Sequence, residues 1–127
     1  MEFSLLELRL LKEHEEIDPK HVDDLRIEIQ KNRYVKPIVV DAKSMVILDG
    51  HHRYNALKKL NARYVPAITV DYGDDSITVG HWREEYKNIT KEDVINAGKT
   101  GKKLPCKTSR HYFPFENEYE VHLNELL

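Results

Sequence analysis

The pattern of apolar and polar residues predicts short strands that alternate with helices. Residues 38–40 and 45–48 form two apolar runs separated by Ala42-Lys43-Ser44, so we expect them to pair as a hairpin. The second run leads into a helical pattern, with apolar residues three or four positions apart, that lasts to about Leu60. Asp49-Gly50 is therefore predicted to be a strand-to-helix turn.

Capping residues indicate where two further predicted helices begin and end. Asp18 is a good N-cap residue and is followed by a proline, which suits the first helical position, so a helix is expected from here to about Asn32. A last helix is expected to open at Thr90, with Asp93 as its capping-box partner, and to stop at Gly98.

Other stretches predict strands and a basic loop. Residues 65–70 are expected to form a strand in which Pro66 lies among the first positions or on an edge, because proline has no backbone N–H. Residues 77–79 are a candidate strand, and the leucine-rich residues 3–11 fit a strand as well as a helical turn. Residues 99–110 are expected to form a basic loop. The tail residues expected to pack down are Phe113, Phe115, Val121, Leu123, Leu126 and Leu127.

Length and composition predict a single domain over residues 1–127. A chain of 127 residues is long enough for a core but too short for a second domain with a linker. A charged fraction of 33% beside 40% hydrophobic residues is typical of soluble proteins, and no apolar run approaches the roughly 20 residues needed to cross a bilayer. The first residues include early acids and no basic region, so we expect no signal peptide and a cytoplasmic protein.

Charge and cysteine content narrow the chemistry. A net charge of -2 and an isoelectric point near 6.4 give nucleic acid no general attraction, so any anion site must be local. The single cysteine, Cys106, excludes an internal disulfide and a cysteine-rich metal site, and we interpret it as a packing residue.

The turn after the hairpin carries the strongest candidate chemistry. A helix that opens at Gly50 presents unpaired N–H groups and the positive end of its dipole, and its first turn carries His51, His52 and Arg53. These groups suit a phosphate. Asp49 would repel it unless this carboxylate caps the helix or holds a Mg²⁺ that bridges to the phosphates. The structural alternative is a capped helix with surface histidines. Zinc is a weaker idea, because adjacent histidines on a helix do not face one point.

Three further groups each allow a structural and a functional interpretation. His14-Glu15-Glu16 is either a solvated turn or a segment that holds one carboxylate inward as a general base. Trp82, the only tryptophan, either packs in the core or walls an active site. Lys107-Thr108-Ser109-Arg110-His111 is either a solvated charge run or a site where the guanidinium fork captures a carboxylate or phosphate.

Together these motifs resemble the ParB/sulfiredoxin superfamily. The resemblance rests on Leu48-Asp49-Gly50-His51-His52-Arg53-Tyr54 and on the preceding Lys36-Pro37-Ile38-Val39-Val40-Asp41. Members share a compact mixed α/β domain that binds nucleotide phosphates at this turn. Within the superfamily, His14-Glu15, Trp82 and the 107–111 stretch with Pro114-Phe115 resemble the free L-serine kinases of archaea.

The resemblance implies that the chain phosphorylates free L-serine to O-phospho-L-serine, a step in cysteine synthesis, with ATP or ADP as donor and Mg²⁺ as cofactor. Glu15 would take the proton from the serine hydroxyl, Trp82 would border the serine pocket, and Arg110 with His111 would hold the carboxylate or the transferred phosphoryl group. The implied residues for donor phosphates and Mg²⁺ are Asp49, Gly50, His51, His52 and Arg53. The implied substrate residues are Trp82, Lys107, Thr108, Ser109, Arg110 and His111.

Some alternatives stay open on these residues. Glu13 and Glu16 flank Glu15, so each is a candidate base. The chain is shorter than the larger kinases of this type, which leaves the choice between ATP and ADP open. A sulfiredoxin is rejected because His51 stands where a reactive cysteine is needed. A ParB-like regulatory or DNA-associated module that binds nucleotide without turnover is the second hypothesis, although a following helix-turn-helix domain has no room here.

Overall fold

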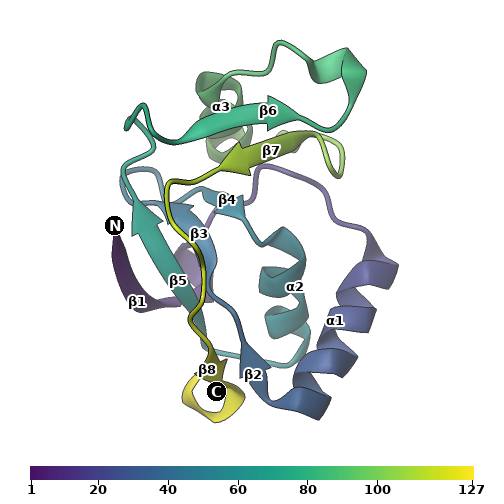
Figure 1. The fold of residues 1–127 in the computed structure, drawn as a ribbon. Helices are drawn as coiled ribbons and strands as arrows, with labels where there is room; N and C mark the ends of the chain where they lie inside the picture. The colour runs from purple at the N-terminus through teal and green to yellow at the C-terminus, as the bar shows by residue number, and fades with distance from the viewer.

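The computed structural model describes residues 1–127 and is built on a mixed four-stranded sheet. Its strands are β1 (Glu2–Glu7), β5 (Tyr64–Val70), β3 (Ile38–Asp41) and β4 (Ile47–Asp49), in that spatial order. The β3–β5 pair is parallel, and the β1–β5 and β3–β4 pairs are antiparallel. Helices α1 (Pro19–Asn32) and α2 (His51–Lys59) pack against each other beside this sheet (Figure 1).

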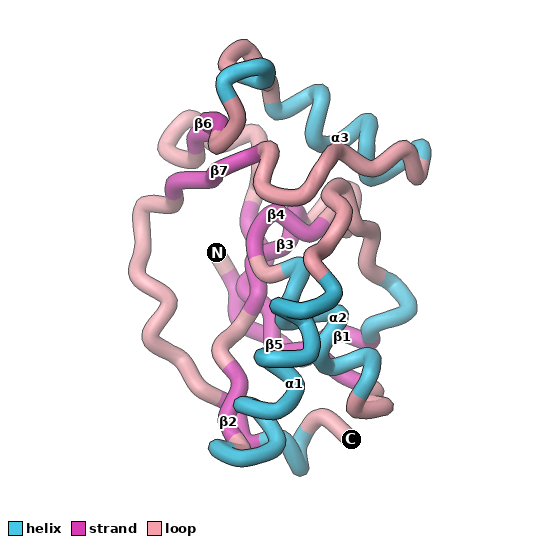
Figure 2. The backbone as a smooth tube through the Cα atoms, turned by 90° about the vertical axis from the view of Figure 1, so that its right-hand side faces the viewer, coloured by secondary structure: helices cyan, strands magenta, loops and turns pink.

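A second group of elements covers the end of the sheet where β4 leads into α2. It consists of the antiparallel ribbon β6 (Thr78–His81) and β7 (Ser109–Tyr112) and of helix α3 (Lys91–Thr100). Figure 2 shows this ribbon and α3 at the opposite end of the molecule from strand β2 (Tyr34–Val35). β2 pairs with β8 (Val121–His122) near the C-terminus. Short 3-10 helices lie at Leu8–Leu10, Glu84–Tyr86 and Leu123–Glu125.

The inner strands β3 and β5 are buried on both faces, and this explains why they are largely apolar along their whole length. Ile38 and Val40 of β3 face a cluster shared with α1 and α2, whereas Val39 between them faces a smaller cluster shared with α3. Successive side chains of a strand point to opposite faces, so a strand covered on both sides needs an apolar residue at every position. The molecule therefore has two hydrophobic clusters separated by the sheet.

The structure confirms the elements that local rules define. The predicted hairpin forms between β3 and β4, although β4 begins at Ile47 instead of at residue 45 and includes Asp49. Asp18 caps α1 by accepting a hydrogen bond from the backbone N–H of Lys20. Thr90 and Asp93 form the capping box that starts α3.

The predicted end of the last helix is wrong. α3 continues past Gly98 to Thr100 and ends at Gly101, whose φ of 75° is the left-handed conformation of a helix cap. Gly98 instead lies against Val46, and a Cβ atom there would lie 2.5 Å from Val46 Cγ2. This glycine allows close approach of helix and strand, which a sequence pattern does not distinguish from a helix stop.

Smaller corrections concern strands and the tail. The predicted basic loop ends at Thr108, because Ser109 and Arg110 already belong to β7. Pro66 lies in an inner strand, so its edge alternative is wrong; it precedes Ala67, where pairing with β3 begins. The leucine-rich residues 3–11 form both a strand and a 3-10 turn. Val121, Leu123 and Leu126 are buried as expected, but Leu127 is 58% exposed.

Candidate functional site

A cavity of about 440 Å³ opens where β4 passes into α2. It is lined by residues from five separate parts of the chain, including nine of the twelve predicted site residues. Those nine are Glu15, Asp49, Gly50, His51, His52, Arg53, Trp82, Lys107 and Ser109. The cavity therefore brings together the N-terminal carboxylate, part of the C-terminal motif and residues 49–53, the predicted phosphate-binding turn, which we call the phosphate turn.

The phosphate turn depends on Gly50. This residue is the N-cap of α2 and has a φ of 103°, and a Cβ atom in its place would clash with the side chain of Ile38. No side chain caps the helix, so the alternative in which Asp49 is the cap is wrong. The first backbone N–H groups of α2 keep their capacity to bind an anion at the positive end of the helix dipole.

The two histidines of this turn are hydrogen-bond acceptors. His51 Nε2 accepts from the backbone N–H of His14 at 3.1 Å, and His52 Nε2 accepts from that of Asp18 at 3.0 Å. Because a backbone N–H only donates, both Nε2 atoms must be unprotonated in this arrangement. Burial is the main cause that lowers the pKa of His51 and of His52. These rings tie residues 14–18 to the start of α2 instead of adding positive charge.

Positive charge at the cavity comes from Arg53 and Lys107. Arg53 Nη2 lies 3.3 Å from Asp49 Oδ2, and the buried Arg53 Nε has no hydrogen-bond partner. A buried donor without a partner destabilises a protein by about 1–3 kcal/mol, so an oxygen-rich ligand beside it would be favoured. Lys107 is exposed and has a φ of 56°, a conformation that is rare for residues other than glycine.

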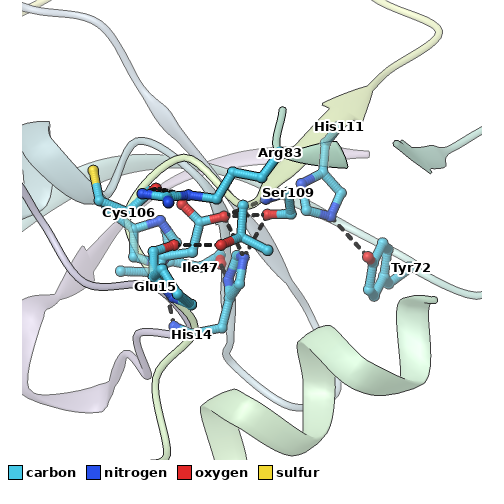
Figure 3. A network of polar contacts seen from close by, with 11 residues as sticks. His14, Glu15, Ile47, Tyr72, Arg83, Cys106, Ser109 and His111 are labelled. Carbon is cyan, nitrogen blue, oxygen red and sulfur yellow. Dashed lines mark hydrogen bonds and ion pairs between the residues drawn. The ribbon is translucent and has the colours of Figure 1, made fainter. Parts of the chain in front are cut away.

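Glu15 is the one carboxylate of its segment that lines the cavity. Glu16 is exposed, and Glu13 is bound by Asn55 and by Lys103. Glu15 is 9% exposed, and its Oε1 accepts hydrogen bonds from Ser109 N at 2.7 Å and Ser109 Oγ at 2.5 Å (Figure 3). Burial by itself raises the pKa of Glu15, but the nearby His14 ring and the Ser109 donors outweigh burial and lower it from 4.5 to about 2.

A short parallel backbone pairing joins the N-terminal segment at Glu15 to the C-terminal part of the chain. Leu104 pairs with Glu15; its backbone N–H donates to the carbonyl of His14, and its carbonyl accepts from the backbone N–H of Glu16, both at 2.8 Å. This pairing places the following strand β7 so that Ser109 reaches the carboxylate. The solvated-turn interpretation of residues 14–16 therefore fails for His14 and Glu15, which are buried, and holds for Glu16.

Trp82 lies at the cavity mouth and is 55% exposed, so it is not a core residue. The guanidinium of Arg110 lies 4.3 Å from the centroid of its ring, and the backbone N–H of Trp82 donates to the carbonyl of Thr108 at 3.1 Å. Arg110 therefore supports Trp82 from outside the cavity.

The other predicted substrate residues also lie outside the lining. The Thr108 hydroxyl donates to the carbonyl of Pro105, and His111 Nε2 lies 2.7 Å from the Tyr72 hydroxyl. Burial, followed by the charge of His14, lowers the pKa of His111 to about 3, so this ring is neutral near pH 7. Thr108 and His111 are therefore bound by other protein groups and do not line the cavity.

The ParB N-terminal domain family matches residues 2–82, which is more than half of the chain. The chain belongs to the ParB N-terminal domain family. Within this ParB domain match lie Glu15, the phosphate turn and Trp82, whereas Lys107 and Ser109 lie beyond it.

Three curated proteins are similar in sequence to this ParB-family chain. A ParB-like protein of Sulfolobus acidocaldarius is 40% identical over 72 residues, covering 57% of this chain and 36% of that protein. An ATP-dependent L-serine kinase of Staphylothermus marinus is 36% identical over 83 residues, covering 61% and 33%. An ADP-dependent L-serine kinase of Thermococcus kodakarensis is 29% identical over 106 residues, covering 80% and 44%. The chain spans less than half the length of these curated relatives.

Solved structures confirm the predicted fold class. A free serine kinase in complex with AMP aligns with a TM-score of 0.86 and 19% identity, covering 98% of this chain and 93% of that one. A conserved hypothetical protein from Pyrococcus furiosus aligns with a TM-score of 0.89 and 18% identity, covering 100% and 98%. The ParB-family chain therefore has the α/β fold of these proteins, with a mixed sheet and flanking helices.

Three lining residues were not among the predicted site residues. One is Leu48 of β4, which directly precedes the predicted turn; the other two, His21 and Leu25 of α1, were missed by the sequence analysis. They are four residues apart and so share one face of their helix, and the His21 ring lies 4.2 Å from that of His52. Leu25 was recognised only as part of an apolar helix face. The i, i+4 spacing of His21 before it was the available signal that this face borders a site.

No group of three or more histidine, cysteine, aspartate and glutamate side chains is arranged to hold a metal ion. Asp49 offers a single carboxylate at the cavity mouth, and its side chain is 59% exposed. That arrangement fits Mg²⁺, which commonly takes one or two protein carboxylates and completes its shell with phosphate oxygens and water. None of the helices is long and apolar enough to span a membrane.

Proposed function

We propose that this protein is a free L-serine kinase that transfers a phosphoryl group from ATP or ADP to the hydroxyl of L-serine. The product, O-phospho-L-serine, would feed cysteine synthesis. One observation carries the proposal: Glu15 and the start of α2 at Gly50 line the same cavity, although they come from different elements. The sequence similarity to proteins named L-serine kinases supports it.

Glu15 would act on the serine hydroxyl. Both hydrogen bonds from Ser109 go to Oε1, which leaves Oε2 to accept from the substrate. With a pKa of about 2, Glu15 is ionised and is a weak base. A weak base suits phosphoryl transfer, in which the loose transition state requires an oriented nucleophile more than an early loss of its proton.

The donor phosphates would bind at the backbone N–H groups of the α2 start and at Arg53. Asp49 would hold Mg²⁺ together with phosphate oxygens, and the ion would supply positive charge to the migrating group. Trp82 would border the serine. Lys107 is the cation of the C-terminal motif that lines the cavity, so it would bind the carboxylate of the substrate serine. Arg110 would act indirectly, by supporting Trp82.

The direct test is an incubation of the purified protein with Mg²⁺, L-serine and either ATP or ADP, followed by detection of phosphoserine by mass spectrometry. We expect product with at least one donor, and the comparison identifies which one. Absence of phosphoserine with both donors would remove the kinase proposal. Parallel reactions with L-threonine and D-serine measure how strictly the cavity selects its hydroxyl substrate.

A second candidate function is nucleotide binding without turnover, as in a regulatory module. The similarity to a protein named only ParB-like favours it. In that case nucleotide would bind at the Gly50 turn, no phosphoserine would form in the unaltered protein, and Glu15→Gln would leave nucleotide binding unchanged. The kinase proposal instead requires that the unaltered protein forms phosphoserine and that Glu15→Gln strongly lowers the rate of product formation while nucleotide still binds.

A further inference from the structure

The ring of His14 is fully buried beside the cavity, and its contacts restrict where its protons lie. Nδ1 lies 2.6 Å from the carbonyl oxygen of Ile47, and Nε2 lies 2.8 Å from Ser109 Oγ (Figure 3). A carbonyl oxygen only accepts, so Nδ1 must carry a proton. The protonation of Nε2 then depends on Ser109.

Ser109 Oγ makes two hydrogen bonds with a single hydroxyl proton. One partner is Glu15 Oε1 at 2.5 Å and the other is His14 Nε2 at 2.8 Å. Two hydrogen bonds need two protons, and the hydroxyl supplies one. The second proton must therefore sit on His14 Nε2 or on Glu15.

The surroundings of Glu15 decide between these two positions. The backbone N–H of Ser109 also donates to Oε1, at 2.7 Å, and two donors that converge on one oxygen favour an ionised carboxylate. An ionised Glu15 accepts the hydroxyl proton of Ser109. The Ser109 oxygen must then accept from His14 Nε2, and so Nε2 carries the second proton.

We propose that His14 is a buried imidazolium, protonated on both ring nitrogens, that acts through Ser109 to keep Glu15 ionised and aimed into the cavity. His14 is a positioning residue, since the hydroxyl of Ser109 stands between it and the carboxylate. The direct separation of His14 Nε2 and Glu15 Oε1 is 3.6 Å, so the two charges also stabilise each other. The expected effect on turnover rests on the proposed kinase function, whereas the protonation state does not.

The other titratable groups that face His14 are neutral histidines. The His51 ring, from α2, lies 4.5 Å away between centroids, and the His111 ring, from β7, lies 5.9 Å away. Burial and then the His14 charge lower the pKa of both. The buried group thus contains one cation and one anion, which is the arrangement that a low-dielectric interior tolerates.

Nuclear magnetic resonance of protein with ¹⁵N-labelled histidine tests the protonation state without any assay of turnover. At pH 7 we expect both ring nitrogens of His14 to carry protons, with the signals assigned by their loss in His14→Asn. Glu15→Gln removes the anion, so His14 should then lose one proton. As a matched control, Glu84→Gln alters the exposed His81–Glu84 pair, 3.5 Å apart, and should leave the His14 signals unchanged.

Either of two outcomes would overturn the proposal. One is an unprotonated ring nitrogen on His14 in the unaltered protein at pH 7. The other is an imidazolium that persists in Glu15→Gln. Neither outcome depends on phosphoserine formation, so a failure of this inference is distinguishable from a failure of the proposed function.

Kinetics test the positioning role. His14→Gln retains an amide that can donate to Ser109 but removes the charge, whereas His14→Asn is too short to reach Ser109. We expect kcat to fall about 10-fold in His14→Gln and further in His14→Asn, with an unchanged KM for nucleotide. Unaltered kcat in His14→Gln would show that the charge has no role in positioning. A parallel rise in the KM for nucleotide would indicate a general structural role instead.

Discussion

The two sides of the cavity hold their charged groups in different ways. The inner wall, formed by Glu15 and Ser109 with His14 beside them, is buried, and the Ser109 hydroxyl makes short hydrogen bonds to two residues distant from it in sequence. The rim, formed by Asp49, Arg53, Trp82 and Lys107, is partly or largely exposed, and its one internal ion pair is 3.3 Å long. The wall is thus fixed before any ligand arrives, whereas the rim has free hydrogen-bonding capacity.

This difference indicates that the wall and the rim have different roles, the wall in turnover and the rim in binding. A charge in a low-dielectric wall interacts strongly and needs no reorganisation during a reaction, so its loss should mainly reduce turnover. A charge at an exposed rim is screened by water and salt, so its loss should mainly weaken binding. A wall variant that mainly weakens binding, or a rim variant that mainly reduces turnover, would contradict this expectation.

The largest expected effect is that of Glu15→Gln. The loss of the carboxylate should lower kcat by about 10²- to 10⁴-fold, because that is the usual contribution of a positioned general base. Nucleotide affinity, measured by calorimetry, should be nearly unchanged. Glu16→Gln is the matched control, since Glu16 is the exposed neighbour in the same segment. Comparable turnover in both variants would place the reaction elsewhere.

The inner wall should also make the fold sensitive to acid. The pKa of His111 is lowered from 6.5 to about 3 and that of Glu15 from 4.5 to about 2, so in both cases the unfolded chain binds protons more readily. Their stabilisation is complete above pH 6.5 and is lost as the pH falls towards 2, with Glu15 contributing roughly 3 kcal/mol. Urea unfolding at several pH values measures this loss. Glu15→Gln should flatten the dependence below pH 4.5, and an unchanged slope would contradict the assignment.

The next effect concerns the rim. Arg53→Ala should weaken nucleotide binding by about 10- to 100-fold, because charge-assisted hydrogen bonds to phosphate are lost. The remaining binding should depend less on salt concentration, since one cationic contact is missing. Arg26→Ala, on the outer part of α1, is the control. An equal dissociation constant for Arg53→Ala and the unaltered protein would discard the phosphate assignment.

The smallest effect is expected for Trp82→Ala. The side chain is 55% exposed, so the melting temperature should change little. The KM for L-serine should rise several-fold if the indole borders the amino acid, while the KM for nucleotide stays the same. A large drop in melting temperature would show instead that Trp82 is a structural residue despite its exposure.

The sequence predicted most of what depends on neighbouring residues. The hairpin, the Asp18 cap of α1, the capping box of α3 and the glycine turn at Gly50 all follow from local rules, and the structure contains each of them. Gly98 was misread because its role is set by Val46, which is far away in sequence.

The site was predicted as separate motifs, and their joining was not predictable in detail. His14 and Ser109 are 95 residues apart, and the pairing of Leu104 with Glu15 brings their segments together. For the same reason His51 and His52 were expected to bring charge. Their partners are backbone N–H groups of His14 and Asp18, which no pattern around the turn reveals.

The reach of the family match, residues 2–82, divides the cavity into two parts. The Gly50 turn and Glu15 lie within the matched residues, but Ser109 and Lys107 belong to a later segment. Replacement of that later segment would therefore remove both hydrogen-bond donors that hold Glu15 Oε1, while the backbone of the Gly50 turn would be retained.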